Sequence, residues 1–215
     1  GEQFQYSSYS FTLASLVMEA ATGKSFARLL EEEVVEPGRI DGLRLDNFLA
    51  LVPHRASFYD RAQDQLMAAV PCDRMPEGSD LTVSLPLNPA YKYAGGGMLA
   101  TSEALARLGA LHYAPGFLSK EAFDLAMTPQ RDASGAETRT GLAWGGRPDA
   151  YGRYAVGHAG SQQGARSILV IYPEERVSIA LMSNLGFYPI DIAGLAASIM
   201  DIAQGGAGSP PADRE

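Results

Sequence analysis

The stretch of sequence that decides the fold reads RSILVIYPEERVSIALMS and spans residues 166–183. Two runs rich in aliphatic residues, 166–172 and 177–183, are separated by Pro-Glu-Glu-Arg at 173–176. A four-residue connection between two such runs is typical of an antiparallel hairpin. Residues 168–172 are apolar without alternation, so we expect the first strand of the hairpin to be buried on both faces of a sheet.

Helix and strand signals are found on both sides of this hairpin. Apolar residues at helical spacing, Ser or Thr at the N-cap and Gly or Pro after the last turn predict helices. Runs of β-forming residues predict further strands. The expected helices span residues 9–22, 26–36, 101–113, 119–128 and 190–203, and the further strands span 140–144 and 154–158, with one short strand around 56–59.

Two of these helices have a defined apolar stripe. In the first helix Leu13, Val17 and either Ala20 or Ala21 follow helical spacing, which is the evidence for that helix. The last helix has a stripe that can cover the sheet, formed by Ile192, Leu195, Ala196, Ile199 and Ile202.

Helices followed by an antiparallel meander that a helix closes predict an α+β fold. Residues 1–130 are expected to form a helical and irregular part of one domain, with weak patterning from 40 to 89. Residues 131–203 are expected to form its C-terminal strands and helix. Residues 204–215, rich in Gly and Pro, predict a flexible tail.

Composition disfavours several classes of protein and site. Seventeen Lys and Arg against 25 Asp and Glu give a net charge of −8, which disfavours nucleic-acid binding. No apolar run approaches the roughly 20 residues of a membrane span. Cys72 is the single cysteine, which excludes an internal disulfide, and His54, His112 and His158 are far apart. We therefore expect no metal site and no cofactor.

Several residues could carry chemistry, although each has a structural interpretation when taken alone. Tyr6 precedes the first helix and can be a packing tyrosine, and His158 lies at the end of a strand and can be a hydrogen-bonded structural histidine. The three glycines at 95–97 lack the Gly-Lys-Ser/Thr of a phosphate loop. Neither Ser-x-x-Lys nor G-x-S-x-G occurs in the sequence.

The order of these signals resembles the serine β-lactamase/penicillin-binding-protein superfamily of class C type. FQYSSYSFTL (4–13) resembles the Tyr-x-Asn segment with its helix, and YKYAGGGMLAT (91–101) resembles the A/P-G-G-G element. HAG (158–160) followed by RSILVIYPEE (166–175) resembles the H/K-T-G strand and the terminal hairpin. The match covers residues 4–203 in order and is nearest to the mitochondrial serine β-lactamase-like branch with its bacterial relatives.

The resemblance implies a β-lactamase/transpeptidase-like fold, in which an antiparallel sheet flanked by helices lies beside a helical region that this chain contains only in part. It also implies a serine hydrolase (an esterase, peptidase or β-lactamase) that works through an acyl-enzyme. Tyr6 would relay a proton, His158 would supply a hydrogen bond or positive charge near the tyrosine oxygen, and the backbone N–H of Ser161 would form half of an oxyanion hole. The implied substrate-binding positions are Ser8, Ala159, Gly160 and Gly96.

Two residues depart from the pattern of this family. Ser8 stands where the family has Asn, and Ala159 replaces a Thr whose hydroxyl could hold a substrate carboxylate. Both changes favour a small ester, amide or peptide substrate over efficient β-lactam hydrolysis. They also leave open an alternative, a catalytically inactive scaffold that uses the fold for ligand binding or assembly.

Because Ser-x-x-Lys is absent, the nucleophile is expected outside this chain. The expected partner is the chain's own N-terminal segment, which would carry that serine. Without it, strand 177–183 or its neighbour would present an unpaired edge, and residues 168–172 would lack cover on part of one face. The resemblance alone implies a periplasmic or otherwise exported location.

Overall fold

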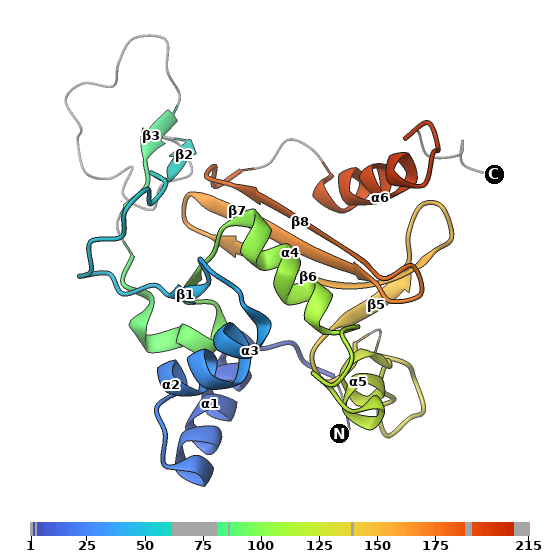
Figure 1. Ribbon diagram of the computed structural model, residues 1–215, viewed down its shortest axis with the longest axis horizontal. Helices are drawn as coiled ribbons and strands as arrows, with labels where there is room; N and C mark the ends of the chain where they lie inside the picture. The colour runs from blue at the N-terminus through green and yellow to red at the C-terminus, as the bar shows by residue number, and fades with distance from the viewer. Residues whose placement is uncertain are drawn as a thin grey trace.

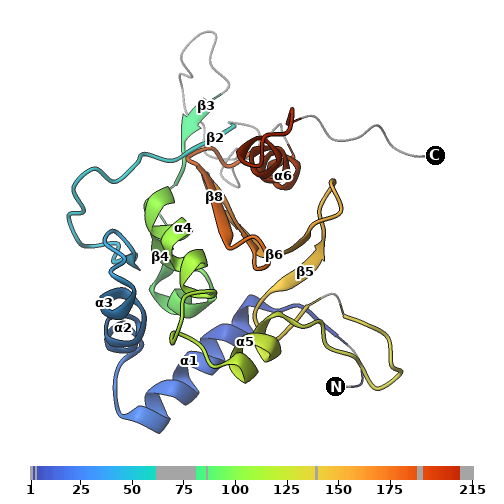
Figure 2. The same cartoon turned by 45° about the vertical axis from the view of Figure 1, so that its right-hand side comes forward.

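A four-stranded antiparallel sheet forms the centre of the computed structural model, which describes residues 2, 4–61, 81–85, 87–138, 140–187 and 191–208. Its strands lie in the order β5-β6-β7-β8. Helices α4 and α6 lie on opposite sides of this sheet, as both views of the chain show (Figure 1, Figure 2). The strands are β5 (Gly145–Pro148), β6 (Tyr154–Gln162), β7 (Ala165–Tyr172) and β8 (Val177–Ser183).

The hairpin predicted from residues 166–183 is confirmed. β7 pairs with β8 from Arg166↔Ser183 to Tyr172↔Val177, which leaves residues 173–176 as the connection. A shorter turn joins β6 to β7, because Gln162 pairs with Ala165 and Gly164 adopts a φ of 67°. These two turns fix the register of all three long strands.

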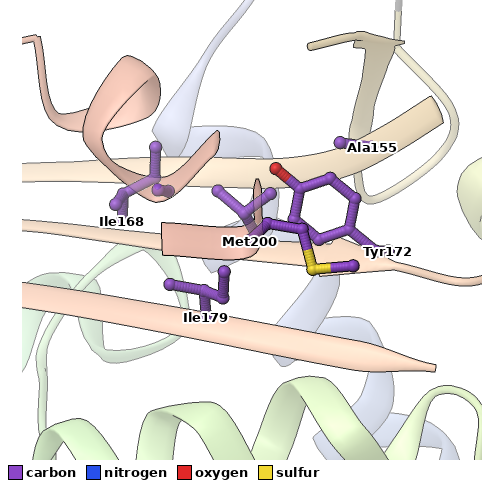
Figure 3. Packing of buried hydrophobic residues seen from close by; sticks show 7 residues of the cluster. Ala155, Ile168, Tyr172, Ile179 and Met200 are labelled. Carbon is purple, nitrogen blue, oxygen red and sulfur yellow. The ribbon is translucent and has the colours of Figure 1, made fainter. Parts of the chain in front are cut away.

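The predicted burial of residues 168–172 on both faces is also confirmed, since none of them is more than 8% exposed. Ile168, Val170 and Tyr172 share one buried cluster with Met200 of α6 (Ile192–Ala203). Figure 3 shows Ile168, Tyr172 and Met200 of this cluster. The alternate residues of β7 face the opposite layer, where they contact side chains of α4 (Ser102–Leu111) and α5 (Lys120–Met127). The expectation that part of one face lacks cover is therefore wrong, because helices of this same chain supply the cover.

The sequence signals for helix ends agree with the structure at most positions. α1 (Ser8–Thr22) ends at Gly23 with a φ of 68°. Ser25, Thr101 and Ser119 each accept a backbone hydrogen bond as N-caps of α2 (Phe26–Leu30), α4 and α5. A π-helical turn, η1 (Glu31–Val35), and α3 (Glu36–Gly38) follow α2 and end the segment at the predicted Pro-Gly pair.

The predicted strand at 140–144 is wrong, because the strand begins at Gly145. The backbone N–H groups of Leu142, Ala143 and Trp144 donate to carbonyl groups of Leu125 and Ala126 at the end of α5. Thr140 forms only an isolated bridge to Gly145. This segment therefore satisfies its hydrogen bonds against a helix terminus instead of a neighbouring strand.

The apolar faces of the first and last helices differ in how well they are covered. The stripe predicted for α6 covers the sheet in part: Ala196 is buried in the core cluster, Ile192 and Ile199 pack against that cluster, and Ile202 is 58% exposed. In α1 the only buried residue is Ser15. Six apolar or aromatic side chains of α1 are between 40% and 68% exposed, namely Tyr9, Phe11, Leu13, Leu16, Val17 and Met18. The α1 face that carries Leu13 and Val17, whose spacing predicted this helix, is thus solvent-exposed among the described residues.

The segment from 40 to 89 contains short strands, as predicted, but no long element among its described residues. β1 (Arg44–Leu45) pairs with β4 (Met98–Leu99), and β2 (Tyr59–Arg61) pairs with β3 (Leu81–Val83). The strand expected around 56–59 therefore begins at Tyr59. Cys72 and residues 209–215 of the predicted tail lie outside the described residues. Among the helices in the described part of the chain, none is long and apolar enough to cross a membrane.

A buried ion pair fixes the β5–β6 turn to α6. Arg153 contacts Asp149 at 2.7 Å, and their side chains are 12% and 6% exposed. Arg153 also donates to the Ala197 carbonyl of α6 at 2.9 Å, and Tyr172 Oη donates to Asp149 at 3.2 Å. Burial alone would raise the pKa of Asp149, but hydrogen bonds from Arg153 and two backbone N–H groups lower it overall.

His112, at the C-terminal end of α4, is a mostly buried histidine whose protonation is expected to lower the stability of the fold in mild acid. Its ring lies edge-on to Trp144 at 5.0 Å and its Nδ1 is 2.9 Å from the Leu108 carbonyl oxygen. Burial lowers the pKa of His112 below its ordinary value of 6.5. The unfolded chain therefore binds a proton at higher pH than the folded chain, and stability falls as pH drops below about 6.5.

We expect the melting temperature of the full-length polypeptide to be lower at pH 5.5 than at pH 7.5, and the difference to shrink in His112→Gln. Thermal denaturation followed by circular dichroism measures both. The matched control is His54→Asn, since His54 is exposed with a φ of 59° that Asn tolerates. An equal pH effect in wild type and His112→Gln would contradict the assignment.

Candidate active site

Tyr6 and His158 are 152 residues apart in the sequence and lie side by side in the structure. Tyr6 Oη is 3.4 Å from His158 Nε2 and 3.3 Å from Ser8 Oγ. The two rings are stacked, with centroids 5.9 Å apart and an interplanar angle of 28°. The Ser8 hydroxyl, the Tyr6 hydroxyl and the His158 imidazole thus form a short chain of polar groups.

Two elements place these side chains. Tyr6 and Ser8 flank Ser7, the N-cap of α1, whose extended backbone (φ −150°) turns the chain into the helix. His158 lies within β6 opposite Leu169 of β7, on the face of the sheet that also carries Val156. Alternation along the strand therefore presents the His158 ring to the layer that contains α4 and α5.

The glycine run connects the start of α1 with β6. A Cβ at Gly95 would lie 2.7 Å from the Ser8 carbonyl oxygen, so only glycine allows this approach. Gly96 has a φ of 132°, and its carbonyl oxygen accepts a hydrogen bond from Nε2 of Gln162. The predicted site residue Gly96 is thereby tied to the β6 strand through Gln162.

The remaining predicted site residues lie along the same strand, but on two faces. Gly160 shares the face of His158, where a Cβ would be 2.5 Å from Ser167 Oγ. Ser161 pairs with Arg166, and Ala159 pairs with Ile168 on the face toward α6. The side chains of Ala159 and Ser161 are therefore directed away from the Tyr6–His158 pair.

The outer edge of β6 is open beside this site. β5 pairs with β6 only from Gly157 to Tyr154, so residues 158–162 have no strand neighbour on that edge among the described residues. Alternate residues of an antiparallel strand direct their N–H and C=O groups toward such an edge. The predicted oxyanion group, the N–H of Ser161, belongs to this exposed stretch of backbone.

The site as described is open to solvent, with Tyr6 56% exposed. No cluster of three or more His, Cys, Asp or Glu suitable for a metal occurs within the described ranges. Tyr6, Ser8 and His158 can accept, hold and pass on a proton.

Gln162 was not predicted from the sequence as a residue of this site. The signal that would have identified it is the Gln-Gly turn at 163–164, which sets the β6–β7 register.

Comparison with known proteins identifies the family of this chain. A family model described as beta-lactamase matches residues 1–203. The chain belongs to the beta-lactamase family. Members of this family are serine hydrolases. The superfamily expected from the Tyr6, glycine-run and His158 motifs is confirmed.

Among curated proteins, the chain is 26% identical over 200 residues to the mitochondrial serine beta-lactamase-like protein LACTB of Homo sapiens. That match covers 81% of this chain and 34% of the human protein, so the chain spans about a third of its relative's length. The similarity agrees with the branch predicted from the sequence.

Two solved structures share the fold. An octameric penicillin-binding protein homologue from Pyrococcus abyssi has a TM-score of 0.71 at 19% identity, covering 97% of this chain and 44% of that chain. A D-stereospecific amidohydrolase from Streptomyces sp. has a TM-score of 0.69 at 19% identity, covering 86% and 52%. The predicted β-lactamase/transpeptidase-like α+β fold is therefore confirmed.

Proposed function

We propose that this chain is the C-terminal part of a serine hydrolase that works through an acyl-enzyme on ester or amide bonds. The observation that supports it is the contact of Tyr6 Oη with both His158 Nε2 and Ser8 Oγ, at 3.4 and 3.3 Å. A hydroxyl held between two polar groups is suited to moving a proton between a nucleophile and a leaving group.

In the proposed reaction the oxygen of a serine outside residues 1–215 attacks the substrate carbonyl carbon. The serine proton passes through Tyr6 Oη to the leaving oxygen or nitrogen as the bond to the leaving group breaks. Water then attacks the acyl-enzyme ester, and its proton returns to the serine oxygen while the carboxylic acid leaves. His158 stabilises the tyrosine oxygen, and the Ser161 N–H stabilises the charge on the carbonyl oxygen.

The nucleophile is proposed to come from an N-terminal segment of the same polypeptide. Three observations support this proposal. The chain spans only 34% of its human relative. Helix α1, which follows Tyr6 in the chain, exposes six apolar or aromatic side chains. β8 pairs with β7 alone among the described strands, which leaves one sheet edge for a further strand.

The substrate is proposed to be a small ester, amide or peptide instead of a β-lactam. Ser8 offers a short hydroxyl beside Tyr6, and Ala159 offers no hydroxyl at all. The structural neighbour from Streptomyces sp. is described as a D-stereospecific amidohydrolase, which adds an amide to the substrates worth testing.

Labelling with a fluorophosphonate probe tests this function. We expect the full-length polypeptide to be labelled on one serine, and peptide mapping to place that serine in a Ser-x-x-Lys outside residues 1–215. A short-chain p-nitrophenyl ester should be hydrolysed, and prior labelling should abolish the hydrolysis. Heat-denatured protein is the control for non-specific labelling.

The labelling experiment also distinguishes the serine hydrolase from the alternative, a catalytically inactive scaffold. Label on Ser8 or Ser161 would contradict the proposed source of the nucleophile. Absence of both labelling and ester hydrolysis would contradict the hydrolase and favour the catalytically inactive scaffold.

A further inference from the structure

β6 contacts the segments around the candidate active site at two separate points, His158 and Gln162. The amide Nε2 of Gln162 donates a hydrogen bond to the carbonyl oxygen of Gly96, a residue 66 positions earlier in the sequence. Gln162 and His158 lie on the same face of β6, because the residues of a strand alternate between its two faces. Four residues separate them by about 13 Å along the strand. His158 therefore contacts Tyr6 at one point, and Gln162 holds the glycine run at the other.

Helix α1, which Tyr6 and Ser8 adjoin, is not held against the sheet by the apolar core. Its only buried residue is Ser15. It packs against the 3-10 helix η3 (Pro89–Gly95) and against α2, and neither of these is an element of the sheet. The three buried apolar clusters within the described residues contain no side chain of α1. Apolar packing therefore does not fix the distance between Tyr6 and β6.

The glycine run connects the first turn of α1 to Gln162. The backbone of Gly95 lies directly against this turn, since a Cβ at Gly95 would be 2.7 Å from the Ser8 carbonyl oxygen. The next residue, Gly96, accepts the hydrogen bond from Gln162. The position of the first turn of α1 therefore depends on a side chain of β6. These contacts form a closed ring that starts and ends in β6 and runs through His158, Tyr6, Ser8, the glycine run and Gln162.

We propose that Gln162 is a positioning residue of the hydrolase, whose hydrogen bond to Gly96 holds α1 at the distance from β6 at which Tyr6 Oη contacts His158 Nε2. The inference rests on the proposed function, in which Tyr6 passes the proton. The Tyr6–His158 contact of 3.4 Å is already long for a hydrogen bond. A small movement of α1 away from β6 would therefore break it.

Two substitutions of Gln162 in the full-length polypeptide test this role. Gln162→Glu keeps the shape of the side chain but, when ionised, has no N–H to donate, and Gln162→Met removes the donor without adding a charge. For both variants we expect kcat for a short-chain p-nitrophenyl ester to fall about 10-fold and KM to change less than about twofold, the pattern of a lost transition-state interaction. The loss is smaller than the roughly 100-fold cost of a 1 Å misplacement, because η3 still holds α1.

Gln163→Glu and Gln163→Met are the matched controls. Gln163 is exposed in the turn between β6 and β7, so these variants make the same chemical changes one residue away from Gln162. Both controls should leave kcat unchanged. Thermal denaturation of all four variants should show them folded at the assay temperature. Equal losses of kcat at the two positions, a rise in KM with unchanged kcat, or a loss of kcat that only follows the loss of folded protein would overturn the proposal.

The ring nitrogen resonances of His158 report the contact with Tyr6 without any turnover. NMR spectra of the full-length polypeptide with ¹⁵N-labelled histidine measure them, and His158→Gln identifies the signal. Tyr6→Phe should shift the Nε2 resonance of His158, because the hydroxyl beside that nitrogen is lost. Gln162→Met should shift it in the same direction, and Gln163→Met should leave it in place.

The spectra separate the positioning role from the proposed function. A shift of the His158 resonance in Gln162→Met, in a protein whose wild type hydrolyses no ester, would keep the role of Gln162 in holding the two residues together and reject the hydrolase. An unchanged His158 resonance in Gln162→Met would reject the role of Gln162, whether or not esters are hydrolysed.

Discussion

Tyr6→Phe lowers kcat for ester hydrolysis by the full-length polypeptide about 100-fold or more, the usual contribution of a positioned proton-transfer group. The substitution removes one oxygen, and with it both the 3.4 Å contact to His158 and the 3.3 Å contact to Ser8. The ring and its stacking on His158 remain. Steady-state hydrolysis of a short-chain p-nitrophenyl ester measures the effect, and KM should change much less than kcat.

Tyr9→Phe is the matched control for this experiment. Tyr9 lies on the first turn of α1, is 65% exposed and has no hydrogen bond to the site. Tyr9→Phe removes a phenol oxygen, as Tyr6→Phe does, but at a position three residues away. Undiminished kcat in Tyr6→Phe, or an equal loss in Tyr9→Phe, would remove Tyr6 from the mechanism.

Arg153→Met destabilises the fold by about 3–5 kcal/mol, the usual effect of removing one partner from a buried ion pair. Asp149 keeps only Tyr172 and backbone N–H groups, and α6 loses the hydrogen bond to the Ala197 carbonyl. Methionine retains most of the apolar stem, so the loss of charge dominates. Chemical denaturation of the full-length polypeptide measures the free energy of unfolding.

The lowered pKa of Asp149 adds a pH dependence to the same experiment. The stability from this carboxylate is present above its unfolded pKa of about 3.9 and is lost as pH falls through the lower, folded value. At acidic pH the difference in the free energy of unfolding between wild type and Arg153→Met should therefore be smaller. The control is Arg107→Met, which breaks an exposed pair with Glu103 and should cost less than about 1 kcal/mol. Equal destabilisation by both variants would show that the Arg153–Asp149 contact contributes nothing beyond a surface pair.

Local sequence signals predicted helices and strands correctly where the residues that form each element lie close together in the sequence. The Val177–Ser183 strand and the N-caps Thr101 and Ser119 depend on residues within a few positions of one another. The strand expected at 140–144 is absent because this segment pairs with the end of α5, 17 or 18 residues earlier in the chain, a contact that no alternation pattern reveals. Tertiary contacts overrode a β-forming sequence there.

The candidate site was predicted from the order of motifs along the chain instead of from local signals. Tyr6, Ser8 and His158 were identified from motif order, and their contact is a geometric fact that spacing alone could not supply. Gln162 was missed because its position depends on strand register, which Gly164 sets by its positive φ. The apolar spacing in α1 predicted the helix but not the exposure of its apolar face, because an apolar stripe does not specify which segment covers it.

The long separation between Tyr6 and His158 has a consequence for the order of folding. Their contact closes a loop of 152 residues, whereas β6, β7 and β8 are neighbours joined by short turns. Local hairpins form before contacts that require large loop closure. During synthesis Tyr6 leaves the ribosome long before His158, so the polar chain between them forms only after the C-terminal sheet exists. Nascent chains that stop before β6 would therefore have no assembled site, however well their helices form.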